Sequence, residues 1–177
     1  MRRRDMLKLA LAGTAVLATT AHAQQSGCPT DGTPLQFVPK KPADPNPAQD
    51  DLAKYPACPY CNMSRKQLNH ARMLVNYSDD LPDGTCSLHC AAISLDVNVD
   101  RGPKAIYVAD VAAPGDVKPL IEVEQASFLV GSKLPGVMTK RSKVAYGTAE
   151  AAKSSQSANG CEVMDFDKVL LAAYTDM

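Results

Sequence analysis

The sequence carries no net charge and no cluster of basic residues. Its 177 residues include 19 lysines and arginines and 19 aspartates and glutamates. Four of these basic residues and one of the acidic residues lie in residues 1–23, so the rest of the chain has a net charge of −3. A mildly acidic chain without a basic patch is unsuited to the phosphate backbone of nucleic acids. Nucleic-acid binding is therefore excluded as a function class.

The N-terminal region lacks an apolar run long enough to cross a membrane. Its apolar stretch, LALAGTAVLA, covers only residues 9–18, whereas a membrane-spanning helix needs about 20 apolar residues. With MRRRDMLK before it and AHA after it, this stretch predicts an export signal that is cleaved after Ala23. Arg3 and Arg4 resemble the pair of a twin-arginine signal. We expect a periplasmic protein, and no lipid anchor, because no cysteine stands at the cleavage point.

No internal repeat is visible in the chain, which argues for one ordinary globular domain. The composition, 45% hydrophobic and 21% charged, agrees with this interpretation. Residues 24–54 are polar and rich in proline, so we expect a linker or an extended arm there. The folded domain is then expected over residues 55–177.

Short strand-like and helix-like segments follow one another in this domain. Apolar runs bounded by turn residues predict strands at 71–78, 103–111, 143–147 and 161–166. Residues 120–132 predict two short strands or one bent strand. The spacing of apolar residues and a possible cap at Thr148 predict helices at 86–98, 148–160 and 165–177. The mixture predicts an α+β domain with a mainly antiparallel sheet and helices packed on it.

Cysteine is the residue type that carries most information here. Six cysteines follow the expected signal, and an even number in an exported protein is typical of disulfides, although 15 pairings are possible. Cys28 and Cys161 are expected to be structural, as a candidate pair. Cys58 and Cys61 stand two residues apart in CPYCNM, and Met63 follows two residues later.

One interpretation of CPYC is a dithiol redox centre, with Cys58 as the nucleophile and Cys61 as the resolving thiol. Such a centre normally follows a buried strand and opens a helix, whose N-terminus lowers the thiol pKa. No apolar strand precedes Cys58 and no βαβ unit surrounds it, so we expect little oxidoreductase activity. Haem attachment is excluded, because Asn62 stands where that motif requires histidine. A plain disulfide between Cys58 and Cys61 is a third interpretation.

The same residues fit a soft-metal site. Soft sulfur donors select Cu(I), and zinc sites rarely use the thioether that Met63 would supply. Candidates for the second half of such a site are His70, Cys86, His89, Cys90 and Met138. On a helix, Cys86 and Cys90 would share one face. Each candidate also has an interpretation without metal. Methionine more often fills a hydrophobic core, and His70 is expected to be a solvated polar residue. His89 is either a ligand or a residue without a role in the site.

Three segments follow one another in a recognisable order. They are CPYCNM, then ARMLVNYSDDLPDGTCSLHCAAISL, and then ASFLVGSKLPGVMTKRSKVAYGTAEAAKSSQSANGCEVMDFDKVL. In this order and spacing, over about residues 55–170, the chain resembles the NosL family of nitrous oxide reductase accessory proteins, and Cys90 matches the family cysteine of the second segment. Two residues depart from the family pattern. Asn62 replaces a glycine, which asparagine can do at a positive φ, and Cys161 takes another glycine position.

The resemblance implies an exported α+β protein, distantly similar to organomercury lyase in fold, that binds Cu(I) and delivers copper to nitrous oxide reductase. The ligands that it implies are Cys58, Cys61 and Met63 from the first segment and Met138 from the Gly-x-Met of the third. Cys58 and Cys90 are candidates for a disulfide or for additional thiolates. We therefore expect a copper delivery protein without catalytic activity. The alternatives are the thiol–disulfide oxidoreductase and a structural domain with paired cysteines.

Overall fold

The computed structural model describes residues 42–159 and 161–177. In these residues the strands form two sheets in which all neighbours are antiparallel. The first sheet has the order β2-β1-β3-β4 and consists of β1 (Met73–Tyr77), β2 (Asp83–Thr85), β3 (Pro103–Ala109) and β4 (Leu120–Glu122). The second has the order β6-β5-β7 and consists of β5 (Ser127–Val130), β6 (Lys143–Tyr146) and β7 (Glu162–Met164).

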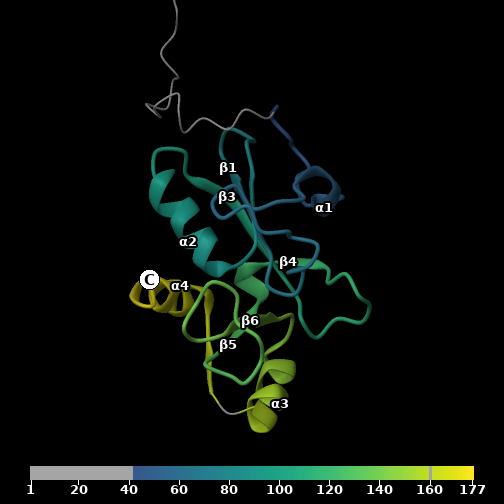
Figure 1. The fold of residues 1–177 in the computed structure, drawn as a ribbon, viewed down its shortest axis with the longest axis vertical. Coiled ribbons are helices and arrows are strands. Elements are labelled where there is room, and N and C mark those ends of the chain that lie inside the picture. The colour runs from purple at the N-terminus through teal and green to yellow at the C-terminus, as the bar shows by residue number, and fades with distance from the viewer. Residues whose placement is uncertain (1–41, 160) are drawn as a thin grey trace, which may run out of the picture.

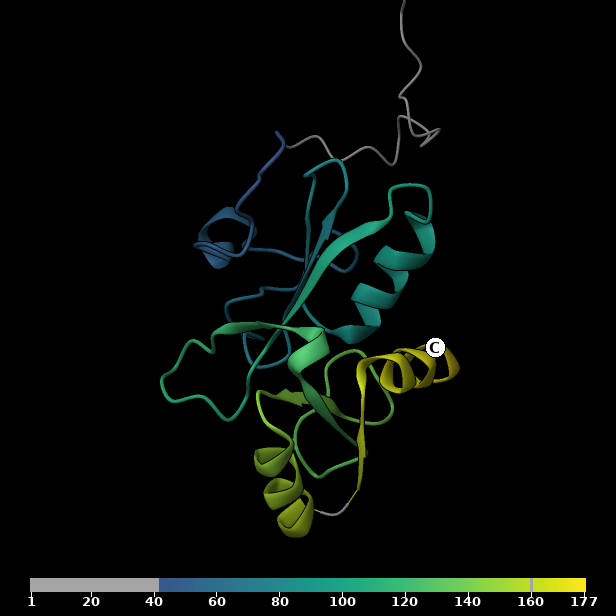
Figure 2. The same cartoon turned by 180° about the vertical axis from the view of Figure 1, so that it is seen from behind.

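The helices lie beside the two sheets. They are α1 (Asp51–Lys54), α2 (Leu88–Val97), the 3₁₀ turn η1 (Val123–Gln125), α3 (Ala149–Asn159) and α4 (Phe166–Thr175). In Figure 1, α2 runs beside the first sheet, α3 beside the second, and α4 lies near the lower end of α2, which it contacts. Figure 2 shows the same arrangement from behind. No helix among the described residues is long and apolar enough to cross a membrane.

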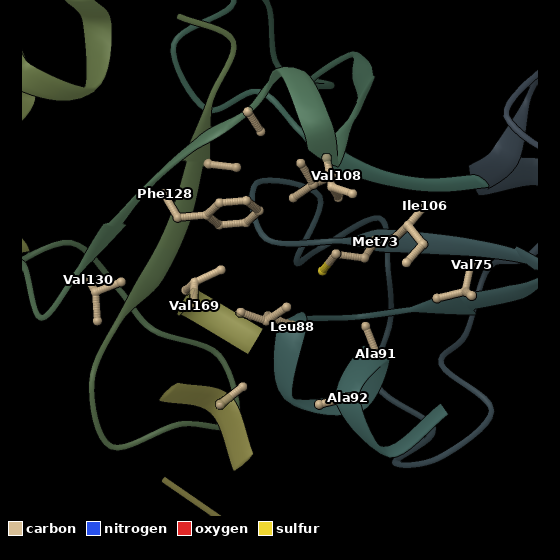
Figure 3. Packing of buried hydrophobic residues seen from close by; sticks show 14 of the residues in the cluster. Met73, Val75, Leu88, Ala91, Ala92, Ile106, Val108, Phe128, Val130 and Val169 are labelled. Carbon is tan, nitrogen blue, oxygen red and sulfur yellow. The ribbon is translucent and has the colours of Figure 1, made fainter. Parts of the chain in front are cut away.

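One apolar core joins the two sheets (Figure 3). Its labelled members come from β1, β3, α2, β5 and α4, and they are Met73, Val75, Leu88, Ala91, Ala92, Ile106, Val108, Phe128, Val130 and Val169. Burial of each large apolar side chain contributes about 1.5–3 kcal/mol. The position of α2 against β1, which matters for the site below, is therefore fixed by core packing.

The predicted fold class, α+β with mainly antiparallel sheets, is confirmed. Strands are present within 71–78, 103–111, 143–147 and 161–166, and helices within 86–98, 148–160 and 165–177. Residues 120–132 form two short strands, β4 and β5, joined by η1. The hydroxyl of Thr148 accepts a hydrogen bond from the amide of Ala151 at the start of α3, as expected of a cap.

The structure differs from the sequence-based prediction at two places next to Cys86 and Cys90. The sequence predicts only a turn at DDLPDG, but residues 83–85 form β2, which pairs with β1. A side chain at Gly84 would place its Cβ 2.7 Å from the Cβ of Tyr55 and 2.8 Å from the Arg65 guanidinium, so glycine permits this close approach. Helix α2 begins at Leu88 and not at residue 86, so Cys86 lies between β2 and the helix.

The folded region begins before residue 55. Residues 42–54, expected as the end of an arm, contact the domain through backbone and side chains. The amide of Asp44 donates to the carbonyl of Asp80, and the hydroxyl of Tyr55 donates to the Asp44 carboxylate at 2.6 Å. Asp51 in α1 is buried against Arg65 and Arg72. The rest of the expected arm, residues 24–41, and the expected export signal lie outside the described residues.

Candidate metal centre

The CPYCNM segment forms a tight turn that is closed by its own backbone. The amide of Cys58 donates to the carbonyl of Met63 at 3.0 Å, and the amide of Asn62 donates to the carbonyl of Cys58 at 2.9 Å. A bridge between Ala57 and Ser64 closes the base of the turn. Asn62 has a φ of 58°, so asparagine supplies the positive φ that we expected at this position.

Four cysteines meet where this turn packs against the start of α2. The Sγ atoms of Cys58, Cys61, Cys86 and Cys90 all lie within 4.8 Å of one another. Cys61 and Cys86 are 3.3 Å apart, Cys86 and Cys90 3.7 Å, and Cys90 and Cys61 3.8 Å. The five cysteines among the described residues are free thiols, so neither a Cys58–Cys61 nor a Cys58–Cys90 disulfide is present, and Cys28 lies outside the described residues.

The cluster is covered on all but one side. Cys58, Cys86 and Cys90 are at most 2% exposed, whereas Cys61 is partly exposed. Apolar contacts to the cluster come from Ala71 and Val137, and from the partly buried Tyr60 and Leu68. An ion from solvent would therefore meet Cys61 first.

Hydrogen bonds within the cluster lower the pKa of one thiol and raise the pKa of two others. Donation from Cys86 and Cys90, and from the backbone amides of Cys61 and Tyr60, lowers the pKa of Cys58 far below its usual value. The bond to Cys58 raises the pKa of Cys86 to about 12 and also raises the pKa of Cys90. Among these three thiols the pKa shifts therefore favour Cys58 as the first to ionise.

A buried arginine holds the two cysteine-bearing segments together. Arg65 is fully buried and donates to the carbonyl of Tyr55, shortly before Cys58, and to the carbonyl of Thr85, directly before Cys86. It also pairs with the carboxylate of Asp51 at 2.9 Å. Since one guanidinium binds both segments, the cluster depends on a residue that carries no ligand atom.

Tyr60, inside the CPYC motif, attaches the turn to β2 and α2. Its hydroxyl donates to the carboxylate of Asp83 at 2.5 Å and accepts from the side-chain amide of Asn98 at 3.2 Å. The hydroxyl of Ser94 donates to the same carboxylate oxygen at 2.7 Å. Burial, followed by the charge of Asp83, raises the pKa of Tyr60, so the hydroxyl stays protonated and remains a donor. Tyr60 thus positions both cysteines of the turn.

We expect Tyr60→Phe to lower the free energy of unfolding by about 1.5–3 kcal/mol, because it removes a hydrogen bond to a charged acceptor. Urea unfolding followed by circular dichroism measures the change. Tyr174→Phe is the matched control, because the Tyr174 hydroxyl donates to a neutral carbonyl, that of Ala92. It should cost about 0.5–1 kcal/mol. An equal or smaller cost for Tyr60→Phe would contradict the positioning role.

The two candidate methionines are exposed and are not core fillers. Met63 is 39% exposed and Met138 is 44% exposed. Met138 has a φ of 53°, a strained value for a residue other than glycine. Its neighbour Val137 packs against the cysteine cluster. Among the described residues, the group that could hold a metal contains the four cysteines and neither His70 nor His89.

Two expectations about single residues change. The sequence favours Cys90 over Cys86 as the additional thiol, but Cys86 lies closest to Cys61 and belongs equally to the cluster. The sequence signal that could have identified Cys86 was its spacing of four residues from Cys90. His70, expected to be solvated, has a buried Nε2 atom without a hydrogen-bond partner.

The dithiol redox interpretation fits this geometry poorly. Cys58, the expected nucleophile, is 2% exposed and cannot reach a substrate disulfide. The CPYC segment forms turns and opens no helix, so no helix N-terminus activates its thiols.

Comparison with known proteins places the chain in a family. Residues 49–173 match the NosL family. The fold is similar to the crystal structure of the copper chaperone NosL from Shewanella denitrificans, with a TM-score of 0.53 and 22% identity over 63% of this chain and 87% of that chain. No curated protein matches. The family match covers most of the described domain, including all four clustered cysteines, and the chain therefore belongs to the NosL family.

Proposed function

We propose that this protein binds Cu(I) at the four-cysteine cluster and delivers it to a copper-dependent client. The observation that carries the proposal is the convergence of four sulfur atoms from two separate segments within 4.8 Å of one another. Thiolate and thioether sulfur are the donors that Cu(I) prefers. Membership of the NosL family agrees with a protein that carries copper and has no catalytic activity.

The charge of the cluster favours a monovalent ion. The pKa of Cys58 is lowered, whereas the pKa values of Cys86 and Cys90 are raised, so these two thiols lose their protons less readily than Cys58. A zinc ion bound by four thiolates would carry a net charge of −2. Two buried cations nearby, Arg65 and Arg72, share the one carboxylate of Asp51, so together these groups leave a surplus of one positive charge. Cu(I) needs fewer thiolates and leaves less charge in this buried place.

Release to a partner would proceed on the side of Cys61. Cys61 is partly exposed and Met63, two residues on, is exposed, so a partner's ligands can replace these two donors first. Met138, on the loop that covers the cluster through Val137, can supply a second neutral donor beside Met63. We propose export to the periplasm and a client of the nitrous oxide reductase type.

A zinc-binding structural site is the second candidate. Four cysteines from two short-range pairs are typical of closed, tetrahedral zinc sites. Such a site would use all four thiols and would have no role for the exposed methionines. The methionines therefore distinguish the two candidates.

We expect the double change Met63→Leu and Met138→Leu to weaken Cu(I) binding by tenfold or more, about 1.4 kcal/mol. Leucine keeps the apolar volume and removes the thioether donor. Since both side chains are exposed, the free energy of unfolding should change little. Competition against a Cu(I) chelator under anaerobic conditions measures the affinity.

Met177→Leu is the matched control, because Met177 is also exposed but lies outside the proposed site. It should leave the Cu(I) affinity unchanged. Equal affinities in the wild type and in the Met63/Met138 double variant would remove the methionines from the site and favour the zinc-binding candidate.

A further inference from the structure

The cluster contains more thiols than the proposed cargo needs. A Cu(I) ion that must be passed on is held best by two or three sulfur donors, and Met63 and Met138 are available as neutral ones. Four thiols are nevertheless brought together, three of them almost completely buried. One Cu(I) ion therefore does not need all four thiols at the same time.

The shortest of three Sγ–Sγ distances in the cluster joins the partly exposed Cys61 to the buried Cys86. The Sγ atoms of Cys61 and Cys86 are 3.3 Å apart, nearer than the other measured pairs in the cluster. A disulfide needs about 2.0 Å between the sulfurs, so an approach of a little more than 1 Å would suffice. Cys61 lies in a turn and Cys86 lies between β2 and α2, so neither sulfur is held within a helix or strand. Cys61 is partly exposed, whereas Cys58 and Cys90 lie behind it.

We propose that the cluster reduces Cu(II) to the Cu(I) that it carries, with Cys61 and Cys86 as the electron donors. Each of these sulfurs gives one electron to a Cu(II) ion, and the two sulfurs then form one S–S bond. Two Cu(II) ions and two thiols yield two Cu(I) ions, one disulfide and two protons. This inference rests on the proposed function, because it supplies the oxidation state that the delivery site binds.

The remaining groups can retain one of the two product Cu(I) ions, and the second leaves to a Cu(I)-binding ligand in solution. After the disulfide forms, the sulfurs of Cys58 and Cys90 are still reduced and lie within 4.8 Å of each other. The thioethers of Met63 and Met138 complete the donor set. A further round requires a dithiol reductant protein to reopen the Cys61–Cys86 bond by thiol–disulfide exchange.

The test is an anaerobic reaction of the fully reduced chain with two equivalents of copper(II) sulfate, in a buffer with acetonitrile as the ligand that keeps the second Cu(I) ion in solution. Electron paramagnetic resonance follows the loss of Cu(II), and the remaining thiols are counted after quenching and unfolding. We expect two Cu(II) ions and two thiols to disappear per chain. Peptide mapping should find one Cys61–Cys86 disulfide. The same chain unfolded in urea, which has the same thiols without their geometry, should react at least tenfold more slowly.

Two variants test whether the reaction takes place at this cluster or at the other thiols of the chain. Cys86→Ala should slow the loss of Cu(II) at least tenfold, whereas Cys161→Ala, which removes a thiol outside the cluster, should react like the wild type. A disulfide that involves mainly Cys28 or Cys161, or a reaction as fast in urea as in the folded chain, would overturn the inference. Cu(I) affinity is measured separately. Tight Cu(I) binding with persistent Cu(II) overturns the reduction alone, and loss of both overturns the proposed function as well.

Discussion

Replacement of Asp51 by alanine is expected to lower the free energy of unfolding by about 3–5 kcal/mol. Asp51 is 6% exposed, and its carboxylate accepts from Arg65 at 2.9 Å and from Arg72 at 2.9 and 3.1 Å. Both arginine side chains are at most 2% exposed. Removal of the carboxylate leaves two buried guanidinium groups without their counter-charge, which costs far more than the loss of one hydrogen bond.

Urea unfolding followed by circular dichroism measures this loss, and Lys104→Ala is the matched control. The Lys104–Asp80 ion pair has a similar distance, 2.8 Å, but its side chains are 54% and 32% exposed. Its removal should cost less than about 1 kcal/mol. A loss of that size for Asp51→Ala would contradict the role of the buried ion pair in fixing the cysteine segments.

The second large effect concerns the metal. We expect Cys86→Ala with Cys90→Ala to weaken Cu(I) binding at least a hundredfold, about 2.7 kcal/mol. The change removes two of the four converging thiols and leaves the CPYC pair and both methionines in place. Alanine avoids a buried hydroxyl without a partner, which serine would introduce.

Chelator competition on the variant and the wild type measures this affinity. Cys161→Ala is the control and should bind Cu(I) like the wild type, because Cys161 lies outside the cluster. If the double variant kept full affinity, the site would consist of the first segment and the methionines alone. The proximity of Cys86 and Cys90 would then have no part in copper binding.

Most of the fold could be predicted from local sequence signals. The strands β1, β3 and β6 are short apolar runs between turn residues, and α3 has its cap at Thr148. Strand β2 could not be predicted, because Asp83–Thr85 carries no strand pattern. It forms because β1 offers a partner and because Gly84 allows close contact with Tyr55 and Arg65.

The sequence predicts which types of ligand form the candidate site, but it predicts less well which individual cysteines take part. The CPYC motif and its methionine identify the first half, since their chemistry is local in the sequence. The approach of Cys86 to Cys61 depends on the β1–β2 hairpin and on Arg65, which binds the segments before both cysteine pairs. An arginine with this role looks like any surface arginine in the sequence. Its burial and its pairing with Asp51 emerge only from tertiary packing.

The most direct measurement is a competition between Cu(I) and Zn(II) for the reduced protein, with the released protons counted by a pH indicator. Cu(I) should bind one ion per chain and release fewer protons than a four-thiolate zinc site would, because Cu(I) needs fewer thiolates. Its affinity should rise between pH 6 and pH 8, since a proton leaves on binding. A hundredfold excess of Zn(II) should not displace it. Tight Zn(II) binding with all four cysteines deprotonated, and no retention of Cu(I) against zinc, would contradict the assignment of the cluster to copper.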